Sequence, residues 1–201
     1  MSILVGRKAP DFTVPAVLNN GEITDKFNLY TTIKNKYGVV FFYPLDFTFV
    51  CPSELIALDH RIKDFHQRNV EIIGVSIDSH FTHNAYRNLA IKDGGIGKVQ
   101  FTLAADIMHG ICQSYGIEHP TAGVALRAAF IIDKTGVVRS QIVNDLPIGR
   151  NIDEILRIVD AVQFFEEHGQ VCPAGWTKGQ VGMQASTQGV AAYLSEHAGS
   201  L

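Results

Sequence analysis

The segment between residues 43 and 54 carries the clearest chemical signal, because it contains Cys51. An apolar run at 39–43 predicts a buried strand, and an apolar stripe after the cysteine predicts a helix. Cys51 therefore lies in or beside the first turn of a helix, which Thr48 caps or Pro52 opens as its first residue. Free backbone N–H groups and the positive helix end favour a thiolate there. A thiolate nucleophile is thus the first chemistry that the sequence indicates.

A thiolate alone does not make Cys51 a fast catalyst. A lowered thiol pKa enlarges the thiolate fraction about 30-fold, but the less basic sulfur is about 13-fold less nucleophilic. The net gain in rate is therefore only about twofold. Other groups must orient the substrate and stabilise the departing oxygen. The candidates are the Thr48 hydroxyl, the Arg127 cation and Pro44, which can shape the pocket and shield the sulfur. Glu54 can orient Arg127 through a charge-assisted contact.

Three of these residues also have a purely structural interpretation. Thr48 can act only as a helix cap, Arg127 as an ordinary ion pair, and Glu54 as a favourable charge at a helix start. Arg127 comes close to the cysteine only if the strand that follows it lies beside the strand at 39–43. The pairing of these two strands is therefore the structural test of the site.

Two more cysteines complete an odd, low number of thiols, which is typical of a reducing compartment rather than of a disulfide-stapled secreted domain. Cys172 follows a predicted helix stop at Gly169, so we expect a mobile, reachable sulfur. Cys112 shares a helical face with apolar residues, which favours a core position over a redox role. His80 and His83 have helical spacing, but no third ligand is evident, so we interpret them as solvated.

Strands and helices alternate along most of the chain. The predicted strands are short apolar runs, the last two forming a hairpin, and cover residues 38–43, 70–77, 128–132 and 137–142. The predicted helices carry apolar stripes and cover residues 53–66, 80–92, 106–115, 152–168 and 190–197. In the longest helix the inward-facing residues are Ile155, Val159, Val162 and Phe165.

This order of elements predicts an α/β fold, a thioredoxin-like sandwich with a central mixed sheet. We expect a domain of residues 1–168 and a C-terminal arm of residues 169–201. The arm is rich in glycine and has little periodicity before its final helix, so we expect it to pack on another surface, such as a second subunit. Trp176 in this arm is a candidate packing anchor.

Composition and charge narrow the class of protein further. Hydrophobic residues make up 46% of the 201 residues, enough for a packed core, and a formal net charge of -3 does not favour nucleic acid or an anionic membrane as partner. No apolar run approaches the length of a membrane span, and residues 1–7 lack the layout of a signal peptide. We therefore expect a cytoplasmic protein that binds neither nucleic acid nor membranes.

Several motifs, in the right order across nearly the whole chain, resemble the peroxiredoxin family. Pro44-x-x-x-Thr48-x-x-Cys51 is similar to the family's active-site motif, and Arg127 before Ala-Ala-Phe-Ile-Ile-Asp matches its distant arginine. Residues 6–12 resemble the family's opening. Val171-Cys172-Pro173-Ala174-Gly175-Trp176 resembles the segment with the resolving cysteine in the typical two-cysteine subgroup, which includes bacterial alkyl hydroperoxide reductase.

The resemblance implies a thiol-dependent peroxidase of antioxidant defence with a thioredoxin fold and no metal or tightly bound cofactor. Cys51 would reduce a hydroperoxide and become a sulfenic acid, and Cys172 of a partner subunit would resolve it as a disulfide. Thioredoxin or a flavoprotein disulfide reductase would recycle the enzyme. Homodimers, commonly five to a ring, are also implied. Arg150 matches an arginine that supports the site in the family, although a surface position in a first helical turn is the alternative.

Two further features bear on over-oxidation. Gly94-Gly95-Ile96-Gly97 resembles the Gly-Gly-Leu-Gly insertion of peroxiredoxins that over-oxidise easily, whereas Tyr193-Leu194 departs from the Tyr-Phe of their terminal helix. In the family this helix covers the active site and opposes the local unfolding that brings the two sulfurs together. Leucine keeps apolar area but lacks the ring, so we expect intermediate sensitivity.

Two other functions are alternatives to the peroxidase. A dithiol–disulfide oxidoreductase would share the fold, but Cys51-Pro52-Ser53-Glu54 has no second cysteine, and Arg127 stands where thioredoxins place a proline. A holdase chaperone or peroxide-signalling role would be an addition to the peroxidase, and no sequence feature specifies it.

Overall fold

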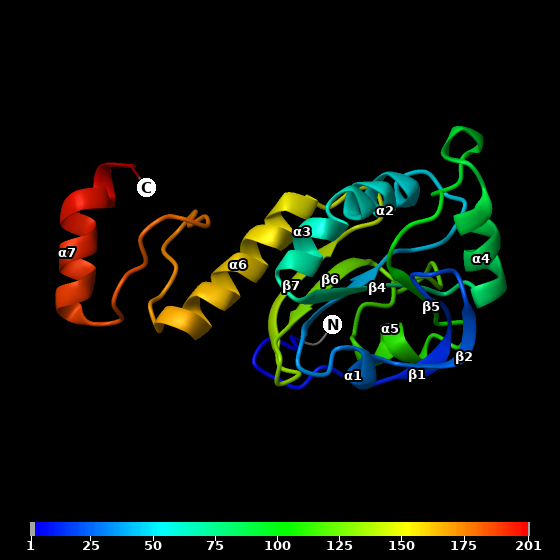
Figure 1. The fold of residues 1–201 in the computed structure, drawn as a ribbon, viewed down its shortest axis with the longest axis horizontal. Helices are drawn as coiled ribbons and strands as arrows, with labels where there is room; N and C mark the ends of the chain where they lie inside the picture. Colours follow the sequence, from blue (N-terminus) through cyan, green and yellow to red (C-terminus); the bar gives the residue numbers. More distant parts are fainter. Residues whose placement is uncertain (1–2, 201) are drawn as a thin grey trace. The chain divides into compact units, whose positions relative to one another are not determined.

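The computed structural model describes residues 3–200. Met1, Ser2 and Leu201, which the predicted domain bounds include, lie outside the described residues. The chain divides into two compact units, which meet in sequence between Ile152 and Asp153. Figure 1 shows the elements of both units, coloured along the sequence. Within residues 3–200, no helix is long and apolar enough to cross a membrane.

The first unit is built on one seven-stranded sheet with the strand order β2-β1-β5-β4-β3-β6-β7. The strands are β1 (Thr13–Val17), β2 (Ile23–Asn28), β3 (Tyr37–Phe42), β4 (Val70–Ser76), β5 (Thr102–Ala105), β6 (Arg127–Ile132) and β7 (Val138–Asn144). β3 lies parallel to β4 and antiparallel to β6, and all six of its residues are buried. The predicted α/β fold with a central mixed sheet is therefore confirmed.

Three strands have no counterpart among the predicted elements. β1 contains Pro15, where its pairing with β2 is irregular, and β2 is largely exposed. β5 is only four residues long. Such short or interrupted segments give no clear alternation, so their pairing is decided by the neighbouring strands.

The helices of the first unit cover both faces of the sheet. They are α1 (Leu29–Thr32), α2 (Cys51–His60), α3 (Ile62–Gln67), α4 (His80–Asn88), the 3-10 turn η1 (Ile91–Asp93) and α5 (Gly110–Ser114). In Figure 1, α2 and α3 lie on one side of the sheet and α1 and α5 on the other. The position of α2 matters most, because its first residue is Cys51.

Three predicted helices differ from the observed ones. The helix expected at 53–66 is divided at Arg61 into α2 and α3, although both still bury the predicted stripe. The helix expected at 80–92 ends at Asn88, because Leu89 is extended. The helix expected at 106–115 is reduced to α5, because the Asp106 carboxylate binds the N–H groups of its first turn.

The second unit contains α7 (Thr187–His197), the 3-10 turn η2 (Ala198–Ser200) and all of α6 (Ile152–His168) except its first residue. α6 has its predicted range, and Ile155 and Val159 are buried as expected. Phe165 is 42% exposed, so its predicted inward position is wrong. At about 100° per residue it is rotated away from the face that Ile155 and Val159 define. α7 begins three residues before its predicted start, since Ser186 caps it by accepting from the Gly189 N–H.

Candidate active site

A short loop connects the end of β3 to Cys51, the first residue of α2. Val50 occupies the N-cap position without a side-chain bond, and Pro52 is the second helical residue. The Thr48 hydroxyl instead contacts the Leu45 carbonyl oxygen at 2.8 Å and Cys51 Sγ at 2.9 Å. Both predicted helix starts, a Thr48 cap and Pro52 as first residue, are therefore wrong. Thr48 is bound to the sulfur instead.

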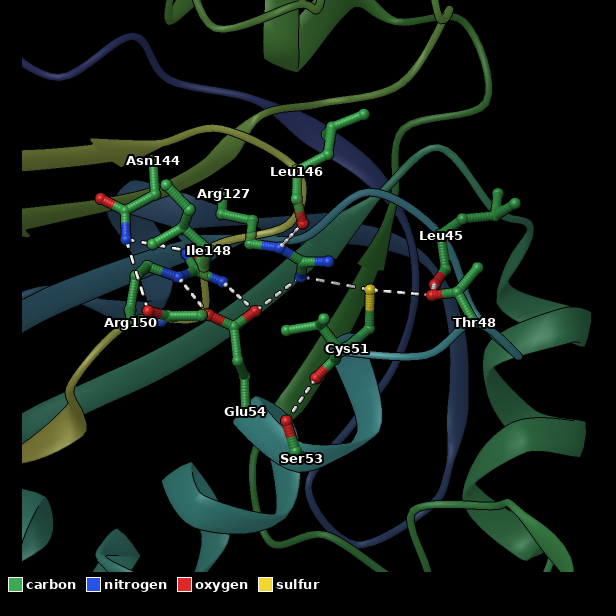
Figure 2. A network of polar contacts seen from close by, with 12 residues as sticks. Leu45, Thr48, Cys51, Ser53, Glu54, Arg127, Asn144, Leu146, Ile148 and Arg150 are labelled. Atoms are coloured by element: carbon green, nitrogen blue, oxygen red, sulfur yellow. Dashed lines mark hydrogen bonds and ion pairs between the residues drawn. The ribbon is translucent and has the colours of Figure 1, made fainter.

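Strand pairing brings Arg127 to the same sulfur. β6 runs antiparallel to β3 with Ala128 opposite Phe42, so Arg127 lies where β3 ends and the loop begins. Its Nη1 atom is 3.4 Å from Cys51 Sγ, as Figure 2 shows. The structural test posed by the sequence is met, because the two strands are neighbours in the sheet.

Glu54 joins two arginines beneath Cys51. Its Oε2 atom accepts from Arg127 Nη1 at 2.8 Å and from Arg150 Nη2 at 3.0 Å. Its Oε1 atom accepts from the Arg150 backbone N–H at 2.7 Å and from Arg150 Nε at 2.9 Å. Arg150 also donates to the Ala128 carbonyl oxygen and stacks on the Phe41 ring. Arg150 is thus a buried partner of Glu54 rather than a surface residue in a first helical turn (Figure 2).

The charges of this buried cluster do not cancel. Burial by itself raises the pKa of Glu54, but the hydrogen bonds and charge of Arg150, with the charge of Arg127, lower it overall, so the carboxylate is ionised at neutral pH. Both guanidinium groups remain charged. Two cations and one anion leave one positive charge beside Cys51. A thiolate would neutralise that charge.

The sulfur is buried, although the loop that precedes it has exposed side chains. Cys51 is completely buried, and Pro44 of the same sequence motif is also buried. By contrast, Phe47 and Phe49 are 51% and 96% exposed. Phe47 also has a left-handed backbone with φ of 55°, which is strained for a bulky residue. The structure thus covers the sulfur while two aromatic side chains of the neighbouring loop face solvent.

A second buried network holds the same loop and has no signal in the sequence. The Asp46 carboxylate accepts from the Tyr43 hydroxyl at 2.8 Å and shares a hydrogen bond with His83 Nδ1, also at 2.8 Å. The Asp46 N–H donates to Asp78 Oδ2 at 2.8 Å. The interpretation of His83 as solvated is therefore wrong. Its partner is 37 residues away in the sequence, so local spacing did not reveal it.

The remaining cysteines have different surroundings. Cys112 is fully buried, and burial together with the charge of Asp106 raises the pKa of its thiol to about 12. Cys172 lies half-buried in the second unit, and burial raises the pKa of its thiol while Arg157 opposes the change. Trp176 is 2% exposed and packs on the Phe164 ring at 4.7 Å, which fits a packing anchor.

In this α/β fold a cysteine at the start of a helix is hydrogen-bonded to a threonine hydroxyl and to an arginine. These features define a cysteine-dependent redox protein. Residues 5–141 match the AhpC/TSA family, and residues 161–196 match the C-terminal domain of 1-Cys peroxiredoxin. The chain belongs to the AhpC/TSA family.

Individual relatives agree along almost the full length. The chain is 52% identical over 195 residues to alkyl hydroperoxide reductase C of Helicobacter pylori, covering 97% of this chain and 98% of that protein. It is 50% identical over 194 residues to alkyl hydroperoxide reductase C of Buchnera aphidicola, covering 96% and 98%. The reduced 2-Cys peroxiredoxin of Plasmodium vivax superposes with a TM-score of 0.93 at 48% identity, covering 96% of this chain and 100% of that one. The predicted thioredoxin-like fold is therefore confirmed.

Proposed function

We propose that the chain is a thiol-dependent peroxidase in which Cys51 reduces hydrogen peroxide and organic hydroperoxides. One observation carries the proposal: Cys51 Sγ lies 2.9 Å from the Thr48 hydroxyl and 3.4 Å from the Arg127 guanidinium. These groups supply what a thiolate by itself lacks, namely an orienting hydroxyl and a fixed cation. The names of the relatives, alkyl hydroperoxide reductase and peroxiredoxin, support the same reaction.

The cluster favours both the nucleophile and the departing oxygen. The thiolate attacks one peroxide oxygen, so that the S–O bond forms and the O–O bond breaks. The leaving hydroxide or alkoxide takes up a proton and departs as water or alcohol. The Thr48 hydroxyl oxygen can accept a hydrogen bond from the hydroperoxide O–H. The hydrogen of the same hydroxyl is donated to the Leu45 carbonyl oxygen or to the Cys51 sulfur. Arg127, held by Glu54, stabilises negative charge on the leaving oxygen.

Cys172 of a second copy then resolves the sulfenic acid. Its thiol displaces water from Cys51, which leaves a disulfide between subunits. Thioredoxin or a flavoprotein disulfide reductase supplies two electrons to restore both thiols. In this proposal residues 1–168 are the peroxidase domain, and the arm of residues 169–201 delivers the resolving sulfur. The enzyme works in the cytoplasm as homodimers, and five of these dimers assemble into a ring.

Single-turnover oxidation tests the proposal on three matched cysteine variants. Cys51→Ser should abolish peroxide reduction. Cys172→Ser should react once but not recycle with a thioredoxin-type reductant. Cys112→Ser is the control and should keep full turnover, because its thiol is buried in the core. Full turnover by Cys51→Ser would overturn the proposal, and insulin reduction by the unmodified chain would favour the dithiol oxidoreductase.

A further inference from the structure

Tyr86, in α4, carries a buried hydroxyl for which residues 3–200 provide no hydrogen-bond partner. Its side chain is completely buried. Buried phenols normally have a partner, because an unsatisfied polar group costs free energy. Two other fully buried tyrosines follow that rule: Tyr43 donates to Asp46, and Tyr115 donates to the Pro10 carbonyl oxygen at 3.0 Å. The Tyr86 hydroxyl is therefore an exception that calls for a functional explanation.

The exception lies beside the reactive loop. The Tyr86 ring packs on the Phe47 ring with centroids 4.6 Å apart. Phe47 directly precedes Thr48, whose hydroxyl contacts Cys51 Sγ (Figure 2). Burial raises the pKa of the Tyr86 phenol, and the negative charges of Asp46 and Cys51 raise it further. The phenol therefore keeps its proton and can act as a hydrogen-bond donor beside the loop that carries Phe47 and Thr48.

We propose that the Tyr86 hydroxyl donates a hydrogen bond to the oxygen that Cys51 acquires from its hydroperoxide. The inference rests on the proposed function, because that reaction brings the oxygen. Before the reaction the hydroxyl has no acceptor among the described residues, and the Asp46 carboxylate is engaged by Tyr43 and His83. After the S–O bond forms, the new oxygen bears lone pairs and, as sulfenate, a negative charge. Tyr86 then stabilises that anion.

The consequence concerns the second oxidation. Sulfenate, rather than sulfenic acid, is the nucleophile that a second hydroperoxide converts to sulfinic acid. A donor that stabilises the sulfenate lowers the pH at which it forms. Tyr86 therefore sets the pH range in which the enzyme over-oxidises.

The test uses full-length Cys172→Ser protein, in which the sulfenic acid cannot be resolved, with and without Tyr86→Phe. The rate of sulfinic acid formation with hydrogen peroxide is measured against pH by mass spectrometry. Tyr86→Phe should move the midpoint of this profile up by about one pH unit, a tenfold change in the ionisation equilibrium. The resistance of the Tyr86→Phe variant to urea should stay equal or rise, because the substitution removes an unsatisfied hydroxyl and keeps the ring on Phe47.

Tyr115→Phe is the matched control, since it removes a buried hydroxyl that has a partner. It should lower resistance to urea and leave the midpoint unchanged. A Tyr86→Phe midpoint equal to that of the parent would overturn the inference. If Tyr86→Phe lost stability as Tyr115→Phe does, the hydroxyl would already have a partner in the reduced protein, and this result would overturn the inference as well. If Cys51 of the parent were not oxidised at all, the proposed function would fail first, and this inference with it.

Discussion

Replacing Glu54 by glutamine removes the one negative charge that holds two buried arginines. Both carboxylate oxygens accept from guanidinium groups, so an amide nitrogen at either position would face a donor. Arg127 and Arg150, whose exposed fractions are only 4% and 8%, would lose their counter-charge. Breaking a buried ion pair from one side costs about 3–5 kcal/mol. We expect Glu54→Gln to lose that amount in the free energy of unfolding, measured by urea denaturation.

The same change should slow the chemistry. Arg127 Nη1 is held at 2.8 Å from Glu54 and 3.4 Å from Cys51 Sγ, so its aim depends on the carboxylate. We expect the rate constant for oxidation by peroxide to fall about 100-fold, the loss typical of one misplaced stabilising donor. Glu154→Gln is the control. Glu154 pairs with Arg157 at a partly exposed site, where an ion pair contributes less than about 1 kcal/mol, and the peroxide rate should not change.

The loss of stability in Glu54→Gln should depend on pH. The folded-state pKa of Glu54 is lowered, so its contribution is fully present above the unfolded value of 4.5 and disappears as pH falls through the folded value. The difference between the unmodified chain and the variant should therefore be constant near neutrality and narrow below about pH 4.5. A variant as stable and as fast as the unmodified chain at pH 7 would refute this reasoning.

Three further predictions concern single residues. Thr48→Val should slow oxidation of the active thiol about 100-fold while Thr48→Ser stays within about tenfold, measured by stopped flow; equal rates would remove the hydroxyl from the mechanism. Cys112 should resist iodoacetamide in the folded chain up to pH 9, since its thiol has a pKa of about 12, and should react after denaturation; mass mapping that finds rapid labelling would contradict its core position. Leu194→Phe should raise the yield of sulfinic acid per turnover, and an unchanged yield would sink the interpretation of the terminal helix.

The sequence indicates the central strands and the position of Cys51, because those signals are local. β3 and β4 are continuous apolar runs, and the cysteine lies between such a run and an apolar helical stripe. The partners of the site are not local. Arg150 reaches Glu54 across 96 residues, and His83 reaches Asp46 across 37. Only the assembled sheet and α4 bring these side chains together.

Other local signals predict a structure that the chain does not adopt, for physical reasons. Threonine is a residue type that often caps helices, but the Thr48 hydroxyl contacts the sulfur and the Leu45 carbonyl oxygen instead. β1 and β2 lack a clear pattern, because one is interrupted by a proline and the other is exposed at the sheet edge. Such an edge strand is defined by pairing with its neighbour rather than by its own residues.

The most direct test of the account is to add one equivalent of hydrogen peroxide to the reduced chain and map every sulfur by mass spectrometry after non-reducing electrophoresis. We predict a band at twice the mass of one chain, in which Cys51 is joined to Cys172 of a second copy and Cys112 remains a thiol. Oxidation at Cys112 or at methionine, with Cys51 still reduced, would contradict the claim that this sulfur is the one built to meet a peroxide.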